Sequence, residues 1–256
     1  MNHISFSALK IWNECPYKHK LKYLDRLSLF SGNEYTAFGT AIHDTCEKKL
    51  LKEKIKDEEH FLKRFEEEIS SLVEDKYDIK ESLVTEMRQQ GGRILTHVED
   101  SLEDYFEDYE VFSSEEEIYV PINENYNFKG FIDVVLKTSD GKYHIMDWKT
   151  CSWGWNAKRK SDKMTTYQLT LYKYFFAKKH NVELKDIETH FGLLKRTAKK
   201  SNVEIFRVSS GKIKIQNCLK LLEKALHNIS NKKFLKNRLA CTSGFGCEFY
   251  KTKHCP

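Results

Sequence analysis

The sequence predicts an α/β protein with a mixed sheet of about four to five strands, flanked by helices. Residues 128–150 form two alternating runs on either side of Asp140-Gly141, and an Asp-Gly pair between such runs predicts a β-hairpin. Residues 187–194 and 203–208 are two further runs of strand character. Amphipathic patterns of helical period precede and follow the hairpin, so we expect helices to flank the sheet.

Chain length and charge set the outer limits of the interpretation. The 256 residues can bury a sizeable core as one domain, residues 1–256, and no Gly/Ser tract marks a linker. Apolar side chains at helical spacing from about 57 to 109 predict two or three helices inserted into that domain. The net charge of +5 is compatible with a nucleic-acid partner but does not establish one.

The chain carries no apolar run long enough to cross a bilayer and no signal-peptide pattern at its start. We therefore expect an intracellular, cytoplasmic protein, acting in a host cell if it is virus-encoded. In that compartment the seven cysteines are expected to be reduced or metal-bound rather than paired in disulfides.

The N-terminal segment predicts helices before the insertion. Ser5 or Ser7 can cap the first helix, and Pro16 predicts a break or a new helix start within it. Another helix begins near Phe38 and carries His43 beside its apolar stripe. A single histidine in such a place is more often structural than a ligand.

The hairpin carries the main chemical signal. Side chains alternate along a strand, so a turn at Asp140 or Gly141 sets Asp133 opposite Asp147, to within one residue. Two carboxylates so close on an otherwise apolar hairpin would repel each other, and a divalent cation between them would remove that cost. Lys149 shares the face of Asp147 and could orient or deprotonate a metal-bound water. The alternative is a half-exposed hairpin with an ordinary polar face.

A basic segment follows the hairpin. Lys158, Arg159 and Lys160 stand close to Trp153 and Trp155. Such a cluster could hold a phosphate backbone and stack a base, which predicts a DNA-binding segment. It could equally be a surface loop with two partly buried tryptophans.

The C-terminal segment, residues 240–256, is rich in cysteine. Cys241, Cys247 and Cys255 lie within fifteen residues of weak periodicity, so they are not expected to be three independent core residues. Clustered thiols in an intracellular protein predict a metal or iron–sulfur site.

The hairpin residues also carry a family resemblance. Gly130-x-x-Asp133 followed by Asp147-Trp148-Lys149-Thr150 resembles the PD-(D/E)XK nuclease superfamily. The branch it resembles most contains the RecB and AddB nuclease domains and the CRISPR-associated four-cysteine exonucleases. The resemblance implies a restriction-endonuclease-like core with a helical insertion, and a metal-dependent nuclease.

The resemblance also implies a metal-ligand set. Gly39-x-x-x-His43 matches the spacing of an element that supplies a metal-binding histidine in that branch. His43 and the Trp148 carbonyl would then complete the shell that Asp133 and Asp147 begin around one or two Mg²⁺ or Mn²⁺ ions.

Two further features gain meaning from the same resemblance. In several relatives an acidic residue of the strand before the hairpin points into the site. Glu117 is the candidate here, and Glu115 or Glu116 is the alternative. Glu117 could equally be an ordinary surface glutamate at the start of the strand. Gln168 and Tyr172 match a Gln-x-x-x-Tyr helix that contacts DNA or braces the site.

Cys15 is where the four-cysteine relatives place the first ligand of a [4Fe–4S] cluster. With Cys241, Cys247 and Cys255 it would make four thiolates that join the two ends of the chain. The tail departs from the usual spacing of the family, having five and seven intervening residues instead of two and five. Zinc, with His254 or His19 as a substitute ligand, or no metal at all, stays open.

The functional prediction is a metal-dependent deoxyribonuclease, expected to be an exonuclease acting on single-stranded or end-containing DNA. The alternative is a non-cleaving DNA-binding protein or an iron–sulfur structural subunit of a repair, recombination or CRISPR adaptation complex. DNA is the expected partner, with a second copy of the chain or a helicase as further candidates. No membrane partner is expected.

Overall fold

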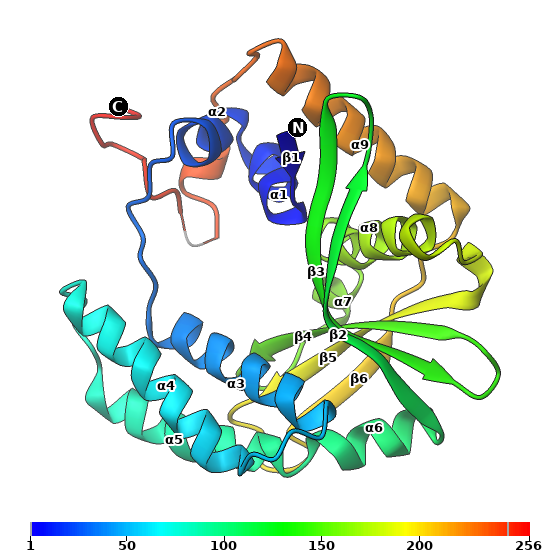
Figure 1. Ribbon diagram of the computed structural model, residues 1–256. Coiled ribbons are helices and arrows are strands. Elements are labelled where there is room, and N and C mark those ends of the chain that lie inside the picture. Colours follow the sequence, from blue (N-terminus) through cyan, green and yellow to red (C-terminus); the bar gives the residue numbers. More distant parts are fainter. Residues whose placement is uncertain (1, 245) are drawn as a thin grey trace. The chain divides into compact units, whose positions relative to one another are not determined.

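A mixed six-stranded β-sheet underlies the fold of the computed structural model, which describes residues 2–244 and 246–256 (Figure 1). The strand order is β1-β3-β4-β5-β6, and β2 pairs with β3. The strands are β1 (Asn2–Ile4), β2 (Tyr109–Pro121), β3 (Tyr126–Thr138), β4 (Tyr143–Cys151), β5 (Ile187–Lys195) and β6 (Val203–Arg207). The predicted α/β class with a mixed sheet is confirmed. The three-residue β1 is too short to give a periodic pattern, which is why the sequence did not predict it.

Helices precede, interrupt and follow the strands. The predicted insertion consists of three helices, and the predicted break at Pro16 separates α1 from α2. The α-helices are α1 (Phe6–Glu14), α2 (Pro16–His19), α3 (Glu34–Leu50), α4 (Asp57–Glu74), α5 (Glu81–Leu95), α6 (Val98–Phe106), α7 (Ala157–Lys160), α8 (Lys163–His180) and α9 (Lys212–Ser230). Short η segments are the π-helix η1 (Lys20–Leu24) and the 3₁₀ turns η2 (Leu184–Asp186) and η3 (Arg238–Cys241).

The chain divides into two compact units, and the division falls inside β2 and β3. We call Gly32–Ile118 with Phe131–Ser210 the sheet unit. The residues up to Ser31, with Tyr119–Gly130 and Gly211–Pro256, form the terminal unit. No helix in the described part of the chain combines the length and apolar character needed to cross a membrane.

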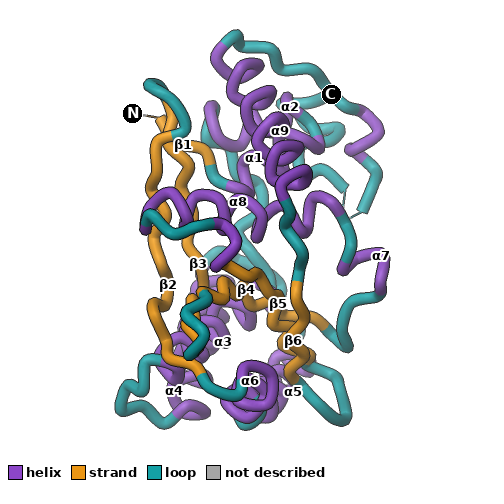
Figure 2. Tube along the Cα trace, turned by 90° about the vertical axis from the view of Figure 1, so that its right-hand side faces the viewer, coloured by secondary structure: helices purple, strands orange, loops and turns teal. Residues whose placement is uncertain are grey.

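In the sheet unit, β4 is paired on both sides (Figure 2). It runs antiparallel to β3, with Val134 opposite Met146, and parallel to β5 along its whole length. β6 closes this part of the sheet antiparallel to β5. Because β4 is a central strand, its side chains alternate between two covered faces, and a charge on either face needs a specific partner.

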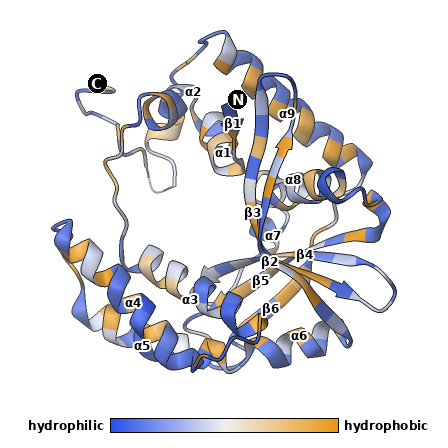
Figure 3. Cartoon of the chain, viewed as in Figure 1, coloured by the Kyte–Doolittle hydropathy of each residue, from blue (hydrophilic) through white to orange (hydrophobic). Residues whose placement is uncertain are grey.

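The core of the sheet unit joins one sheet face to helices α3 to α6. Trp148 and Met146 of β4 lie in one apolar cluster with Phe38 of α3 and Phe61 of α4. In Figure 3 the helices α4 and α5 carry hydrophilic and hydrophobic residues side by side, as amphipathic helices do. Gly91 interrupts the pattern of α5 because a Cβ there would lie 2.1 Å from the Phe61 ring.

The terminal unit is built on the parallel pair of β1 and β3, in which Ile4 lies opposite Phe128. The Ser5 side chain caps α1 by accepting a hydrogen bond from the backbone N–H of Ala8 at 3.2 Å. The helix ends at Cys15, whose backbone is extended, as the residue before a proline prefers. Helix α9 packs against α1.

Candidate metal and catalytic site

The ladder between β3 and β4 ends at Val134 and Met146, and the next residue on each strand is an aspartate. Asp133 and Asp147 therefore stand where the two strands separate. The Asp133 side chain takes the place of the next ladder partner, because its Oδ2 accepts a hydrogen bond from the backbone N–H of Trp148 at 2.6 Å. The predicted opposition of the two aspartates is the arrangement that this register gives.

Burial makes this carboxylate pair costly. Desolvation raises the pKa of Asp133 to about 6, although Lys149 and the Trp148 N–H act in the opposite direction. Desolvation also raises the pKa of Asp147 to about 6, and the charge of Asp133 adds to the effect. Asp147 is 1% exposed. Two carboxylates that disfavour their own ionisation in this way favour a cation between them.

His43 of α3 approaches the same carboxylates. Its Nδ1 lies 3.7 Å from Asp133 Oδ2, and its Nε2 is buried without a hydrogen-bond partner. Desolvation lowers the pKa of His43 to about 4, with a further lowering from Lys149. The ring is therefore neutral at pH 7, which is the form that can donate a lone pair to a metal.

Lys149 supplies the positive charge of the site. Its Nζ lies 2.5 Å from Asp147 Oδ2. Burial lowers the pKa of Lys149, but the charges of Asp147 and Asp133 outweigh burial and hold that pKa above its ordinary value. The side chain is an ammonium at neutral pH, so it can orient a water or hold an anion and cannot accept a proton.

Helix α8 braces Asp147 from the other side. The Gln168 side-chain amide donates to Asp147 Oδ1 at 2.7 Å and to the Tyr172 hydroxyl at 3.3 Å. Burial and the charge of Asp147 raise the pKa of Tyr172. These hydrogen bonds hold Asp147 against α8, and a contact of this helix with DNA stays a prediction.

The three glutamates of β2 have different surroundings. Desolvation raises the pKa of Glu115 to about 7, and the charges of Asp133, Glu47 and Asp147 raise it further, which places Glu115 beside the aspartates. Glu116 instead pairs with the side chains of α8. Glu115 and Glu117 are both exposed, and the backbone carbonyl of Glu117 accepts a hydrogen bond from Lys179 of α8.

Glu47 is a member of the site that the sequence analysis missed. Its charge raises the pKa of both Asp133 and Glu115. It follows His43 by four residues on α3, so both side chains lie on one helix face. That spacing was the signal that could have identified it.

The donors of this site fit a hard divalent cation. They comprise two carboxylates, a neutral imidazole with an orphaned buried nitrogen, and the Trp148 carbonyl. The N–H and C=O of one strand residue point to the same side, and the Trp148 N–H points at Asp133. The carbonyl therefore also points toward the aspartates. Carboxylate and carbonyl oxygens suit Mg²⁺ and Mn²⁺, and imidazole is compatible with Mn²⁺.

The basic segment is only partly free to meet a ligand. Lys158 is exposed, but Arg159 lies over the Trp155 ring with its Cζ 4.4 Å from the ring centre. Lys160 pairs with Glu204. Trp155 is buried, whereas Trp153 is 79% exposed. The residues available for stacking and phosphate contact are thus Trp153 and Lys158, with Arg159 already engaged.

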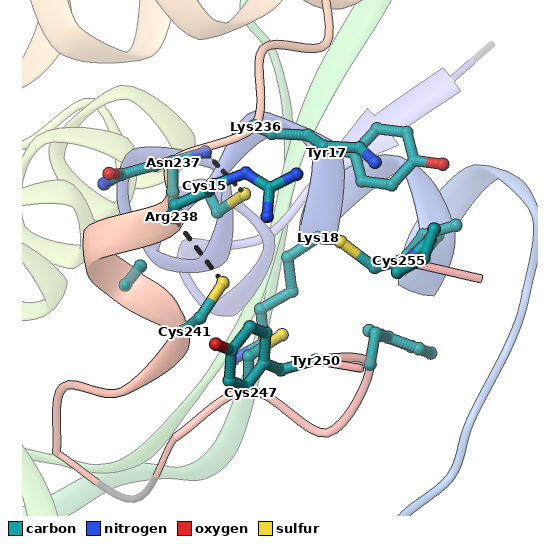
Figure 4. Close-up of a pocket in the computed structure, with 14 residues that line it drawn as sticks. Cys15, Tyr17, Lys18, Lys236, Asn237, Arg238, Cys241, Cys247, Tyr250 and Cys255 are labelled. Atoms are coloured by element: carbon teal, nitrogen blue, oxygen red, sulfur yellow. Dashed lines mark hydrogen bonds between the residues drawn. The ribbon is translucent and has the colours of Figure 1, made fainter. Parts of the chain in front are cut away.

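In the terminal unit, Cys15, Cys241, Cys247 and Cys255 line one pocket (Figure 4). Desolvation and the neighbouring thiols raise the pKa of Cys241. The Cys15 Sγ accepts a hydrogen bond from the Asn237 N–H at 3.3 Å. The predicted cysteines do come together, although they lie near opposite ends of the sequence.

Cationic side chains stand around this pocket, although burial and the neighbouring thiols raise the pKa of Cys241. Lys18, Lys236 and Arg238 line it, and their charges would offset those of deprotonated thiols. Neither His19 nor His254, the alternative zinc ligands, is among its lining residues. None of the seven cysteines is paired in a disulfide.

Comparisons with known proteins agree with this geometry. A family model described as "PD-(D/E)XK nuclease superfamily" matches residues 3–252. No curated protein matches the sequence.

Two solved structures are similar to this chain. A protein from Eubacterium rectale named "Putative exonuclease" superposes with a TM-score of 0.61 at 13% identity, covering 100% of this chain and 90% of that one. The structure named SSO0001 gives a TM-score of 0.45 at 15% identity, covering 97% and 84%. At these identities the likeness to the Eubacterium rectale structure shows the fold alone.

Proposed function

Because the chain belongs to the PD-(D/E)XK nuclease superfamily, we propose that it is a metal-dependent DNA nuclease that hydrolyses phosphodiester bonds. We propose further that it is an exonuclease acting on single-stranded or end-containing DNA. The observation that carries the proposal is the pair formed by the partly buried Asp133 and the buried Asp147, with the neutral imidazole of His43 beside it.

Each side chain has a defined task in this proposal. Asp133, Asp147, His43 and the Trp148 carbonyl hold Mg²⁺ or Mn²⁺, which supplies a water of lowered pKa and positive charge beside the phosphate. Gln168 keeps Asp147 in place through its hydrogen bond to Oδ1. These groups stand on strands and helices, so they are held in position before the substrate binds.

Lys149 and Glu115 act on the attacking water and the phosphate. The ammonium of Lys149 orients the water and offsets the charge that develops on the phosphate oxygens. Glu115 has a pKa of about 7, so its carboxylate can accept a proton near neutral pH. The proposal therefore assigns the inward-pointing acidic residue to Glu115, one of the two alternatives to Glu117.

We also propose that Cys15, Cys241, Cys247 and Cys255 hold a [4Fe–4S] cluster that stabilises the terminal unit. A zinc ion bound by the same cysteines is the alternative. Four thiols and three nearby cationic side chains suit a negatively charged thiolate-bound group.

The test uses protein purified without oxygen and three DNA substrates. These are end-labelled linear single-stranded DNA, end-labelled linear double-stranded DNA and circular single-stranded DNA, each with Mg²⁺, Mn²⁺ or EDTA. The expected result is metal-dependent loss of linear strands with the circle intact, and no loss with Asp147→Ala. The visible spectrum of the same sample should show a broad absorption band at about 400 nm if the cysteines hold an iron–sulfur cluster.

Each outcome has a distinct meaning. Cleavage of the circle would show an endonuclease and refute exonuclease action alone. Cleavage by Asp147→Ala at the wild-type rate would refute the site. Absence of cleavage with either metal, alongside retained DNA binding, would favour a non-cleaving subunit instead.

A further inference from the structure

A second group of metal-ligating side chains lies on β4 and β5, on the sheet face opposite to Asp147. His144 lies directly opposite Glu188 across the parallel ladder, and His190 follows Glu188 by two residues. Alternation places these three side chains on one face. The same alternation sends Asp147, three residues after His144, to the other face.

The three side chains converge closely. One ligand atom of each lies within 4.8 Å of the other two, so small side-chain movements would bring all three around one ion. The His144 Nδ1 and the His190 Nε2 are 3.1 Å apart. Two zinc-bound nitrogens about 2.0–2.1 Å from the metal at the tetrahedral angle are separated by about 3.3 Å. The rings need almost no movement to bind one ion together.

Hydrogen bonds orient His144 as a ligand. The Thr138 hydroxyl donates to Asp140 Oδ1 at 2.6 Å, so its hydrogen is already committed. It must therefore accept from the His144 Nε2–H, 3.0 Å away. This fixes the proton on Nε2 and leaves the Nδ1 lone pair directed toward His190. A carboxylate acting on the far nitrogen of a histidine is the usual support of a metal-bound ring.

His190 has an unsatisfied polar atom. The residue is 2% exposed, and its Nδ1 is buried without a hydrogen-bond partner. The rings of Tyr105 and Phe106 pack edge-on against it. The other nitrogen of this ring, Nε2, is the one that faces His144 Nδ1; without a metal the two nitrogens share a hydrogen bond, which a bound ion would replace.

A pocket of about 450 Å³ gives access to the group. The acidic side chains of Glu107, Asp108 and Asp140 line it, so its potential attracts cations. Arg207 reaches Glu188 at 3.1 Å and is itself largely exposed. An incoming divalent cation can replace this guanidinium without any change in the strands.

We propose that His144, His190 and Glu188 form a second metal site that takes Zn²⁺, with its fourth position open to the acidic pocket. Two imidazoles and one carboxylate are a zinc-type donor set, whereas Mg²⁺ prefers oxygen ligands throughout. Bound zinc would link β4 to β5 beside the end of α6, and so stabilise the sheet unit. The site is separate from the proposed nuclease centre and does not depend on it.

The experiment compares zinc binding by the full chain and three variants. Zinc is titrated against a chromophoric zinc chelator in excess Mg²⁺, which occupies the proposed metal site at Asp133 and Asp147. Glu188→Gln removes a partly exposed ligand, and His144→Gln removes a buried one. Glu183→Gln is the matched control, since it makes the same change on an exposed glutamate outside the group. Thermal unfolding with and without zinc is measured for each protein.

We expect the wild type and Glu183→Gln to bind one more zinc equivalent than His144→Gln. Glu188→Gln should bind that zinc at least about 10-fold more weakly. Zinc should raise the Tm of the wild type by more than that of either ligand variant. Any zinc held by cysteines is common to all four proteins and cancels in the comparison.

Identical zinc isotherms for the wild type and Glu188→Gln would overturn the proposal. So would an equal rise in Tm on adding zinc. If His144→Gln does not fold, Glu188→Gln still decides the question, because its side chain lies at the pocket rather than in the core.

Discussion

The carboxylate site of the sheet unit and the cysteine pocket of the terminal unit are built in different ways. Asp133, Asp147, His43 and Gln168 stand on two strands and two long helices; Asp147 is buried, and the other three are partly buried. The four cysteines stand at a helix break, a 3₁₀ turn and the irregular C-terminal segment. Rigid elements suit a site that must keep its geometry through a reaction, whereas a bound cluster can itself order irregular chain.

The carboxylate site and the cysteine pocket also differ in their electrostatics. The charge of Asp133 raises the pKa of Asp147, and both carboxylates depend on Lys149 for charge compensation. The cysteines are lined by three cationic side chains. The carboxylate site therefore trades stability for affinity toward a cation, and the cysteine pocket is expected to gain stability when it is filled.

The largest effect should come from the carboxylate site. Lys149→Ala and Asp147→Asn should each lower the rate of DNA cleavage by at least about 10³-fold, because each removes charge that stabilises the transition state or holds the metal. In EDTA, Asp147→Asn should keep or raise the Tm, since it removes one of two buried carboxylates. Lys142→Ala, on the exposed hairpin turn, is the control. If Asp147→Asn instead lowered the Tm by several degrees in EDTA, Asp147 would be needed for folding. The contrast between the carboxylate site and the cysteine pocket would then be lost.

A substitution in the cysteine pocket should instead lower the stability of the protein. Cys247→Ser should abolish the absorption near about 400 nm and lower the Tm by several degrees, because a metal site held by folded ligands contributes to folding. Cys151→Ser lies outside the pocket and should change neither quantity. Absorption and Tm that survive in Cys247→Ser would show that the four thiols hold no cluster.

A smaller effect is expected on β2. Glu115→Gln should lower the cleavage rate by about 10-fold and flatten its rise with pH near 7, since Glu115 has a pKa of about 7 and ionises there. Glu117→Gln should leave rate and pH profile unchanged. The pH profile distinguishes a proton acceptor from a residue that only shapes the strand. The reverse ranking of the two variants would return the role to Glu117.

The sequence alone determined a good part of this protein. The Asp-Gly turn and the alternation predict the hairpin register to within one residue, because the register follows from local geometry. Asp133, Asp147 and Lys149 could therefore be placed on one face of the hairpin without a structure. Helical periodicity likewise gave the three-helix insertion and α8, on which Gln168 stands.

Only the tertiary structure decided the rest. The choice among three consecutive glutamates depends on the backbone of β2, where Glu115 has a φ of 46° that breaks the regular alternation. The convergence of His144 with Glu188 and His190 depends on the pairing of two strands that are separated by helix α8, and no local pattern records that pairing.

The burial of Trp155 beneath Arg159 and the closure of the cysteine pocket are also long-range results. Sequence periodicity shows which face of a helix is apolar, because residues three or four positions apart lie on the same face. Which elements meet depends on the packing of the whole chain, and with it the partners that give a buried charge or a thiol its function.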